Sequence, residues 1–269
     1  MEHASPIGAF FIIVFGGIIL FALLRAGRGF NFSIRKIRAI RAIDEAVERA
    51  IESGRPVLFT SGMTGVGPLL YACLGILKHI SINTARLGAK LFAPCIDPEV
   101  FIFTQSTVQS AYRLEGKTNQ YDESAVRFLS DEQFAYASGY MGIAHREKVG
   151  AAFLFGTFAA ESLILAEAGD QVGAMQIAGT TSNEQIPFFI TTCDYTLLGE
   201  ELYAAGAFFS NDPIQKASLR AQDLCKLLIL GLVIVGTIIS TLGNLGAISD
   251  SWNLKNLLTL TWPKIFGAT

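Results

Sequence analysis

The chain has 269 residues, which is enough for one or two domains with a sizeable core. Hydrophobic residues make up 51% of it and charged residues only 16%, against a usual charged fraction of about 25%. This excess predicts membrane segments, and the net charge of -2 gives no reason to expect a nucleic-acid partner. The four cysteines and three histidines are dispersed without a CxxC pair, so we expect reduced thiols and no metal site.

The first predicted element is a membrane anchor within residues 1–24. Residues 7–24, IGAFFIIVFGGIILFALL, carry no charge and approach the length of about 20 apolar residues that crosses the hydrocarbon core. A cleaved signal peptide is the alternative. We favour an anchor because the flank MEHASP has no Lys or Arg and no small-residue cleavage site follows.

Residues 25–54 predict a basic amphipathic helix beside the membrane. Ile34, Ile37, Val47 and Ile51 fall on roughly one face of this helix. Its first half carries six basic residues with no acidic residue among them, namely Arg25, Arg28, Arg35, Lys36, Arg38 and Arg41. Because they lie next to a span, we expect them to contact lipid headgroups rather than nucleic acid.

Residues 55–210 alternate apolar runs with helical patterns. The strand-like runs are 56–60, 89–95, 125–130, 150–158, 174–179 and 185–193. Short uncharged strands between helices are typical of a parallel sheet covered on both faces. We therefore expect an α/β fold with a Rossmann-like, mostly parallel sheet of about six strands in the cytoplasm.

One segment of this region competes with the α/β interpretation. Residues 150–169 are long and apolar enough to be a third span. Glu161 and Glu167 would then lie in lipid, at a cost of a few kcal/mol each unless paired. A buried strand followed by a helix avoids that cost and is favoured.

The second predicted span is residues 227–248, after a connector at 211–226. The span carries no charged residue, and Asn244 is its one strongly polar side chain. Basic residues precede it at Lys216, Arg220 and Lys226, whereas only Lys255 and Lys264 follow it. Since positive charge stays in the cytoplasm, residues 25–226 should be inside a prokaryotic cytoplasmic membrane and both termini outside.

The tail, residues 249–269, has Trp252 and Trp262 flanking a run of leucines. Tryptophan favours the membrane interface, where its ring is buried and its N–H stays hydrated. We expect a short amphipathic helix on the outer surface. A loosely ordered tail is the alternative.

Small and polar residues follow the predicted strands, at the ends where open parallel sheets bind ligands. They are Ser61, Gly62, Thr64, Gly65, Gly67, Asp97, Gly156, Thr157, Gly179, Thr180, Thr181 and Asn183. We expect these twelve residues to contact any small ligand.

The stretch SGMTGVG, residues 61–67, combines the end of a strand, three glycines and the start of a helix. Phosphates bind at such places because glycines let backbone N–H groups approach closely. The expected ligand is a nucleotide or another phosphorylated metabolite, although no cofactor is fixed. The loop lacks the Lys and Ser/Thr of a Walker loop, and its spacing is not that of a dinucleotide loop. A purely structural turn is the alternative.

Glu161 and Glu184 are the two weak candidates for a general base, because each follows a strand within or beside a Gly/Thr-rich loop. The alternatives are a favourable charge near a helix N-terminus for Glu161 and a solvated loop residue for Glu184. No Ser–His–Asp or Cys–His arrangement accompanies them. The sequence therefore favours a module that is not an enzyme.

The segment AIDEAVERAIESGRPVLFTSGMTG, residues 42–65, resembles an uncharacterised family of prokaryotic membrane proteins. The shared pattern is a helix, then a G-[RK]-P-V-[LF]-F-T strand that here begins at Gly54, Arg55 and Pro56, then the glycine loop. The resemblance extends over most of the cytoplasmic part. It implies a prokaryotic membrane placement and adds no catalytic residue.

Three functions remain open from the sequence. The first is a membrane-anchored module that binds a small ligand for regulation or assembly. The second is a ligand-free scaffold or accessory subunit, either a homo-oligomer or part of a larger membrane complex. The third is an enzyme that uses Glu161 or Glu184. A monomeric transporter is disfavoured because two spans without an intramembrane charge make no path.

Overall fold

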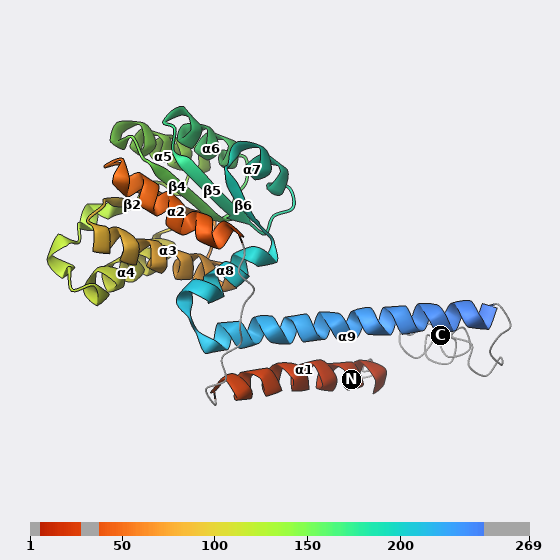
Figure 1. The fold of residues 1–269 in the computed structure, drawn as a ribbon. Coiled ribbons are helices and arrows are strands. Elements are labelled where there is room, and N and C mark those ends of the chain that lie inside the picture. Colours follow the sequence, from red (N-terminus) through yellow and green to blue (C-terminus); the bar gives the residue numbers. More distant parts are fainter. Residues whose placement is uncertain (1–5, 28–37, 245–269) are drawn as a thin grey trace. The chain divides into compact units, whose positions relative to one another are not determined.

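The computed structural model describes residues 6–27 and 38–244 (Figure 1). The chain divides into two compact units, residues 34–212 and a unit formed by 1–33 with 213–269. The first unit is an α/β domain and the second is a pair of helices.

The α/β domain contains a single sheet with helices between its strands. The strands are β1 (Val57–Gly62), β2 (Leu91–Cys95), β3 (Val126–Phe128), β4 (Ala151–Thr157), β5 (Met175–Thr180) and β6 (Tyr195–Leu198). The helices are α2 (Arg38–Glu52), α3 (Pro68–Leu87), α4 (Pro98–Leu114), α5 (Gln133–Glu147), α6 (Glu161–Gln171), α7 (Ile186–Thr192) and α8 (Glu200–Ser210). Two short 3-10 turns, Thr118–Gln120 and Glu123–Ala125, precede β3.

The strand order is β3-β2-β1-β4-β5-β6, and every neighbouring pair is parallel. This confirms the predicted α/β class and the Rossmann-like sheet of six strands. Strands β1 and β4 are neighbours although β2 and β3 come between them in sequence. The loops that leave β1 and β4 therefore diverge to opposite faces of the sheet, at the position where folds of this kind bind ligands.

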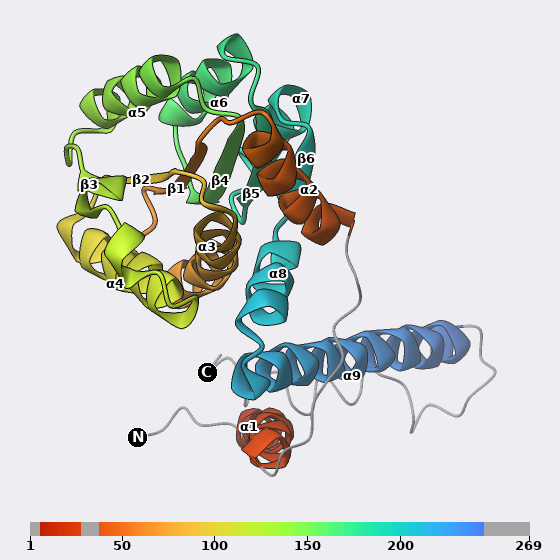
Figure 2. The ribbon, with the colours of Figure 1, turned by 60° about the vertical axis from the view of Figure 1, so that its left-hand side comes forward.

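Helices cover both faces of the sheet (Figure 2). Helices α2, α3, α4 and α8 bury one face around Val57 and Phe59, and α5, α6 and α7 bury the other around Leu58. The alternation follows from the period of two along a strand. With both faces buried, the strands have to be apolar on every side, which explains runs such as AAFLF in β4.

The last predicted strand was wrong. Residues 185–193 contain helix α7, and the sixth strand, β6, begins at Tyr195 inside a predicted helix. Aromatic and β-branched residues gave this stretch the composition of a strand. However, Pro187 lies in the first turn of α7, where the missing N–H costs nothing. Residues 150–169 form β4 and α6 rather than a third span.

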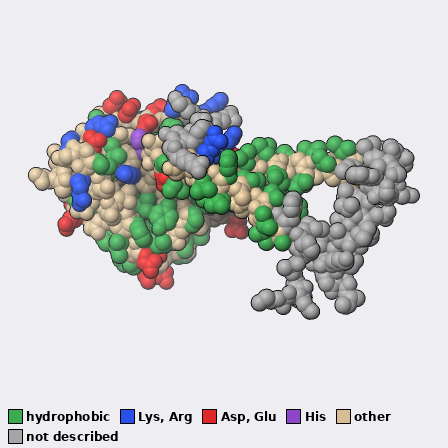
Figure 3. Space-filling model, turned by 90° about the horizontal axis from the view of Figure 1, so that it is seen from below, with side chains coloured by type: hydrophobic (Ala, Val, Ile, Leu, Met, Phe, Trp, Pro, Cys, Tyr) green, Lys and Arg blue, Asp and Glu red, His purple; other side chains and the backbone are tan. Residues whose placement is uncertain are grey.

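Helices α1 (Pro6–Gly27) and α9 (Pro213–Asn244) pack against each other and run antiparallel (Figure 1). Hydrophobic side chains line the described surface of this pair (Figure 3). Within the described residues, one segment, Pro213–Ile238, is long and apolar enough to cross a membrane. The apolar part of α1, Phe11–Gly27, is shorter. Of the two predicted spans, only the second is therefore long and apolar enough within the described residues. Helix α9 also begins earlier than predicted, at Pro213 within the predicted connector.

The residues predicted at the membrane interface are only partly described. Arg25 lies in the last turn of α1, with its guanidinium carbon 5.9 Å from the ring centroid of Phe21. Arg38 and Arg41 are exposed on α2. Arg28, Arg35, Lys36, Trp252, Trp262 and the rest of the tail lie outside the described residues.

Candidate functional site

The loops after β1 and β4 are joined to each other by the side chain of Thr64. Its hydroxyl donates to the Ser61 carbonyl at 2.5 Å and accepts from the Thr157 N–H at 2.7 Å. The Met63 N–H also donates to the Thr157 carbonyl, at 2.8 Å. Thr64 is buried, so its hydroxyl bridges the two strand ends from within the fold.

Two glycines make this junction possible. Gly156 has φ +150°, and a Cβ there would lie 2.2 Å from both the Ser61 carbonyl oxygen and Thr64 Oγ1. Gly62 has φ +57°, and a Cβ there would lie 2.5 Å from the ring of Phe158. The space between the two loops does not admit even a methyl group, and a pyrophosphate is much larger. The predicted ligand residues Gly62, Thr64, Gly156 and Thr157 are thus packed closely against one another at this point.

In the second part of the loop after β1, from Gly65 to Gly67, the two glycines are not packed against other described residues. A Cβ on Gly65 or Gly67 would meet nothing within 4 Å, and neither residue has a left-handed φ. Helix α3 starts after Gly67 without a side-chain cap, and Pro68 at its start has no N–H. Nothing in the described fold therefore requires these two glycines, and their backbone is open to a ligand or partner.

A buried hydroxyl pair lies beneath the junction. The hydroxyls of Thr60 and Tyr136 are hydrogen-bonded, and Thr60 Oγ1 also accepts from the Gly62 N–H at 2.9 Å. Tyr136 is fully buried on α5, and this burial raises the pKa of its phenol well above the ordinary value. The phenol therefore stays neutral and ties α5 to the end of β1.

Glu161 is fully buried at the first position of α6. Its carboxylate accepts from the Ala159 N–H at 3.0 Å and from the Gln133 side-chain amide. A carboxylate there also meets the positive end of the helix. These contacts fit a structural role at least as well as that of a base. Glu184, the other candidate base, is exposed in the loop before α7.

The remaining predicted ligand residues are spread along the carboxyl edge of the sheet. Asp97 caps α4 and accepts from the Glu99 N–H at 2.7 Å. Gly179 and Thr180 lie inside β5 and are buried, whereas Thr181 and Asn183 follow it in the loop. Within the described part of the chain, no group of three or more His, Cys, Asp or Glu residues is placed to hold a metal ion.

Charge at the carboxyl edge has one sign. The loops that follow the six described strands, residues 63–67, 96–97, 129–132, 158–160, 181–185 and 199, contain no Lys or Arg. They do contain acidic residues, including Asp97, Asp131 and Glu184. A phosphate bound there would depend on backbone N–H groups and neutral side chains such as Thr181 and Asn183, with no loop cation to balance its charge. The edge is poorly suited to a highly charged anion.

Three cysteines, two of them buried and one half-buried, are poor nucleophiles at neutral pH. Burial raises the pKa of the Cys95 thiol to about 12 and that of Cys193 to about 11. The pKa of Cys73, also buried, is raised further for the same reason. The thiolate is the reactive form, so these three side chains remain protonated and inert at neutral pH.

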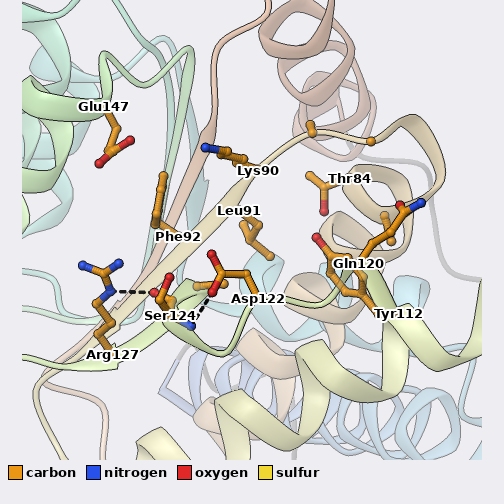
Figure 4. Close-up of a pocket in the computed structure, with 14 residues that line it drawn as sticks. Thr84, Lys90, Leu91, Phe92, Tyr112, Gln120, Asp122, Ser124, Arg127 and Glu147 are labelled. Atoms are coloured by element: carbon orange, nitrogen blue, oxygen red, sulfur yellow. Dashed lines mark hydrogen bonds between the residues drawn. The ribbon is translucent and has the colours of Figure 1, made fainter. Parts of the chain in front are cut away.

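A cavity of about 320 Å³ lies at the opposite, amino edge of the sheet (Figure 4). Its polar lining includes Thr84, Lys90, Tyr112, Gln120, Asp122, Ser124, Arg127 and Glu147. Hydrogen bonds from Ser124, followed by the charges of Arg127 and Lys90, lower the pKa of Asp122. The cations of this cavity thus have carboxylates beside them. The sequence did not suggest this cavity, because its lining comes from widely separated segments.

The chain matches one protein family over most of its length. A family model described as a domain of unknown function (DUF6754) matches residues 4–250. The chain belongs to this family. No curated protein and no solved structure matches it. The DUF6754 match includes both helical segments and the whole α/β domain, and it carries no assigned activity.

The structure gives a physical reason for the GRPV stretch of this DUF6754 member. The Arg55 guanidinium donates to the carbonyls of Lys148 and Val149 at 2.7 Å each, after the end of α5. It also donates to the carbonyls of Val172 and Gly173, after the end of α6. Carbonyl groups at the end of a helix have no hydrogen-bond donor within the helix, and Arg55 supplies the missing donors. Arg55 is therefore a clamp between the ends of two helices, next to the start of β1.

Proposed function

We propose that this chain is a membrane-anchored α/β module that takes part in assembling a membrane complex. The observation that carries the proposal is the contrast at the carboxyl edge. The ends of β1 and β4 are joined by Thr64, while large apolar side chains around them are exposed. A surface of this kind suits a protein partner better than a nucleotide.

The membrane half of the proposal is supported by α9. Its segment Pro213–Ile238 could cross a bilayer, and its leucine, isoleucine and valine side chains are mostly exposed. Helix α1 would form a second, shorter span or an anchor beside it. Six Lys or Arg residues lie between positions 25 and 41 and three between 216 and 226, whereas only two follow residue 248. This asymmetry beside the two helices favours a cytoplasmic α/β domain with both termini outside a prokaryotic cell.

The assembly half is supported by the side chains near the ends of the strands. Exposed apolar residues there include Met63 and Val66 after β1, Phe134 on α5, Leu163 on α6 and Phe188 on α7. Single exposed apolar residues are ordinary in soluble domains. Their concentration at one acidic edge is what points to a partner.

The full-length protein is expected to remain in the membrane pellet after washing with alkaline sodium carbonate. After gentle detergent extraction from its own host, it should migrate on native mass spectrometry as an assembly larger than one chain. Release into the carbonate supernatant would contradict the membrane half. A single chain free of other proteins at all concentrations would contradict the assembly half.

A small ligand is the second candidate function, and the open backbone at Gly65 and Gly67 favours it. Gly65→Asp is expected to leave the melting temperature of the free protein within about 1 °C, because such exposed changes cost little. It should abolish any melting shift caused by ATP, ADP or inorganic phosphate. A shift that persists unchanged in this variant, or a wild-type protein that shows none, would dismiss the loop as a phosphate site.

An enzyme is the least supported of the three functions. Glu161 would have to give up its contacts with Ala159 and Gln133 to act as a base. Glu184 is exposed to solvent, in a loop without a basic partner.

A further inference from the structure

We propose that this chain associates with further copies of itself, head to tail, through the two ends of the α3–α4 helix pair. The inference rests on the assembly role proposed above and names the partner. The head is the surface formed by Met63, Val66, Tyr71, Glu99, Ile102 and Phe103. The tail is the surface formed by Arg86, Leu87, Arg113, Leu114 and Lys117.

Helices α3 and α4 form a unit with two well-defined ends, because they pack together and each end is fixed by a contact. At the start of the pair, the rings of Tyr71 and Phe103 meet edge to face with centroids 6.5 Å apart. At the finish, Arg86 donates to Glu115 at 2.9 Å. At each end, therefore, a side chain of α3 contacts a side chain at the corresponding end of α4.

The head is apolar with an acidic rim. Ile102 is 63% exposed, and Met63, Val66, Tyr71 and Phe103 are exposed as well. Glu99 is exposed beside them, and Asp97 caps the same helix. No Lys or Arg occurs in the two loops that lead into α3 and α4.

The tail is apolar with a basic rim. Leu114 is 63% exposed and Leu87 lies exposed at the end of the neighbouring helix. Arg86 and Arg113 are exposed, and the Lys117 amine donates to the Ala85 and Arg86 carbonyls at 2.9 and 3.0 Å. The acidic groups nearby include Glu115, which is paired with Arg86, Asp122, which accepts from the Ser124 N–H, and the exposed Glu123.

The opposite charges of the head and the tail favour head-to-tail contact between copies over head-to-head or tail-to-tail contact. Two heads in contact would bring Glu99 of each copy together, and two tails would bring arginines together. A head against a tail places apolar residues in the centre and opposite charges at the rim. Because every copy has one of each, such contacts are heterologous and continue into a ring or a filament.

The test uses the full-length protein in a non-ionic detergent, studied by sedimentation velocity over a range of concentrations. The wild type is expected to form species larger than a dimer, and these should shrink as salt rises and screens the rim charges. Ile102→Asn in the head and Leu114→Asn in the tail should each weaken association about tenfold or more, as central interface residues do. Both side chains are largely exposed, so both variants should keep the wild-type circular dichroism spectrum.

A mixture of the two variants gives the sharpest result. Each variant keeps one intact surface. At a concentration where each variant alone is mainly monomeric, an equal mixture should therefore form one-to-one dimers and no larger species. Ile190→Asn is the matched control, because Ile190 is an apolar residue 53% exposed on α7, which covers the other face of the sheet from α3 and α4. It should behave as the wild type.

Three results would overturn the proposal: a monomeric wild type, association that neither variant weakens, or a mixture no different from its components. Association through α1 and α9 would be one cause of association that neither variant weakens. The broader assembly role is tested by a different result. If the membrane complex contains other proteins and its size is unchanged by both variants, the assembly role stands and self-association through these surfaces does not.

Discussion

Arg55→Met is expected to lower the free energy of unfolding of the α/β domain by about 3 kcal/mol, since hydrogen bonds to a charged group contribute about 1.5–3 kcal/mol. The substitution keeps the aliphatic part of the side chain and removes the guanidinium. It leaves four carbonyls, after α5 and α6, without their donor. Because Arg55 is only half-buried, water replaces part of what is lost, which is why the expected loss is not larger.

Pulse proteolysis of the full-length protein in urea measures this loss directly. Arg49→Met is the matched control, because Arg49 is an exposed arginine on α2 for which the structure shows no side-chain hydrogen bond. The control should change stability by no more than about 0.5 kcal/mol, as is usual for surface positions. Equal losses in the two variants would mean that the clamp contributes nothing beyond a surface charge.

Gly156→Ala is expected to destabilise the domain by about 3 kcal/mol or more, through overpacking and backbone strain together. The added methyl would lie 2.2 Å from two oxygens of the neighbouring loop, in a backbone conformation that L side chains rarely adopt. The Thr64 bridge between β1 and β4 would have to open. The urea midpoint of the full-length protein should fall accordingly.

The same substitution at Gly65 provides the comparison. Gly65→Ala adds the same methyl to the same pair of loops, where it meets nothing within 4 Å. Its midpoint should match the wild type or lie slightly above it, because alanine reduces the freedom of the unfolded chain. Similar behaviour of the two variants would show that the loops are not closed on each other as described.

Much of the α/β fold could be predicted because the strands are buried on both faces. Such strands appear as continuous apolar runs, and five of the six runs correspond to a strand. The sixth run failed because α7 is short and aromatic, with Phe189 as its one buried residue, so no helical periodicity could develop. The strand order depends on contacts between distant segments, which local patterns do not contain.

The position of the strand-end loops was predictable, but the contacts within them were not. Residues after the strands do gather at one edge, as the parallel sheet requires. The sequence cannot tell whether Thr64 faces a ligand or the Thr157 N–H, because both uses need a small hydroxyl side chain among glycines. Arg55 could not be recognised as a clamp either, because its four carbonyl partners lie more than 90 residues away.

The central position of β1 has a consequence for biosynthesis. A ribosome completes β1 first among the strands, yet β1 pairs on one side with β4, which ends at Thr157. At about 5–20 residues per second, β1 exposes an unpaired edge for roughly 5–20 s until β4 is made. An apolar strand with a free edge is an aggregation hazard during that interval. The nascent chain should therefore depend on a chaperone or on rapid covering of β1 by α2 and α3, and slower translation between β3 and β4 should lower the yield of folded protein.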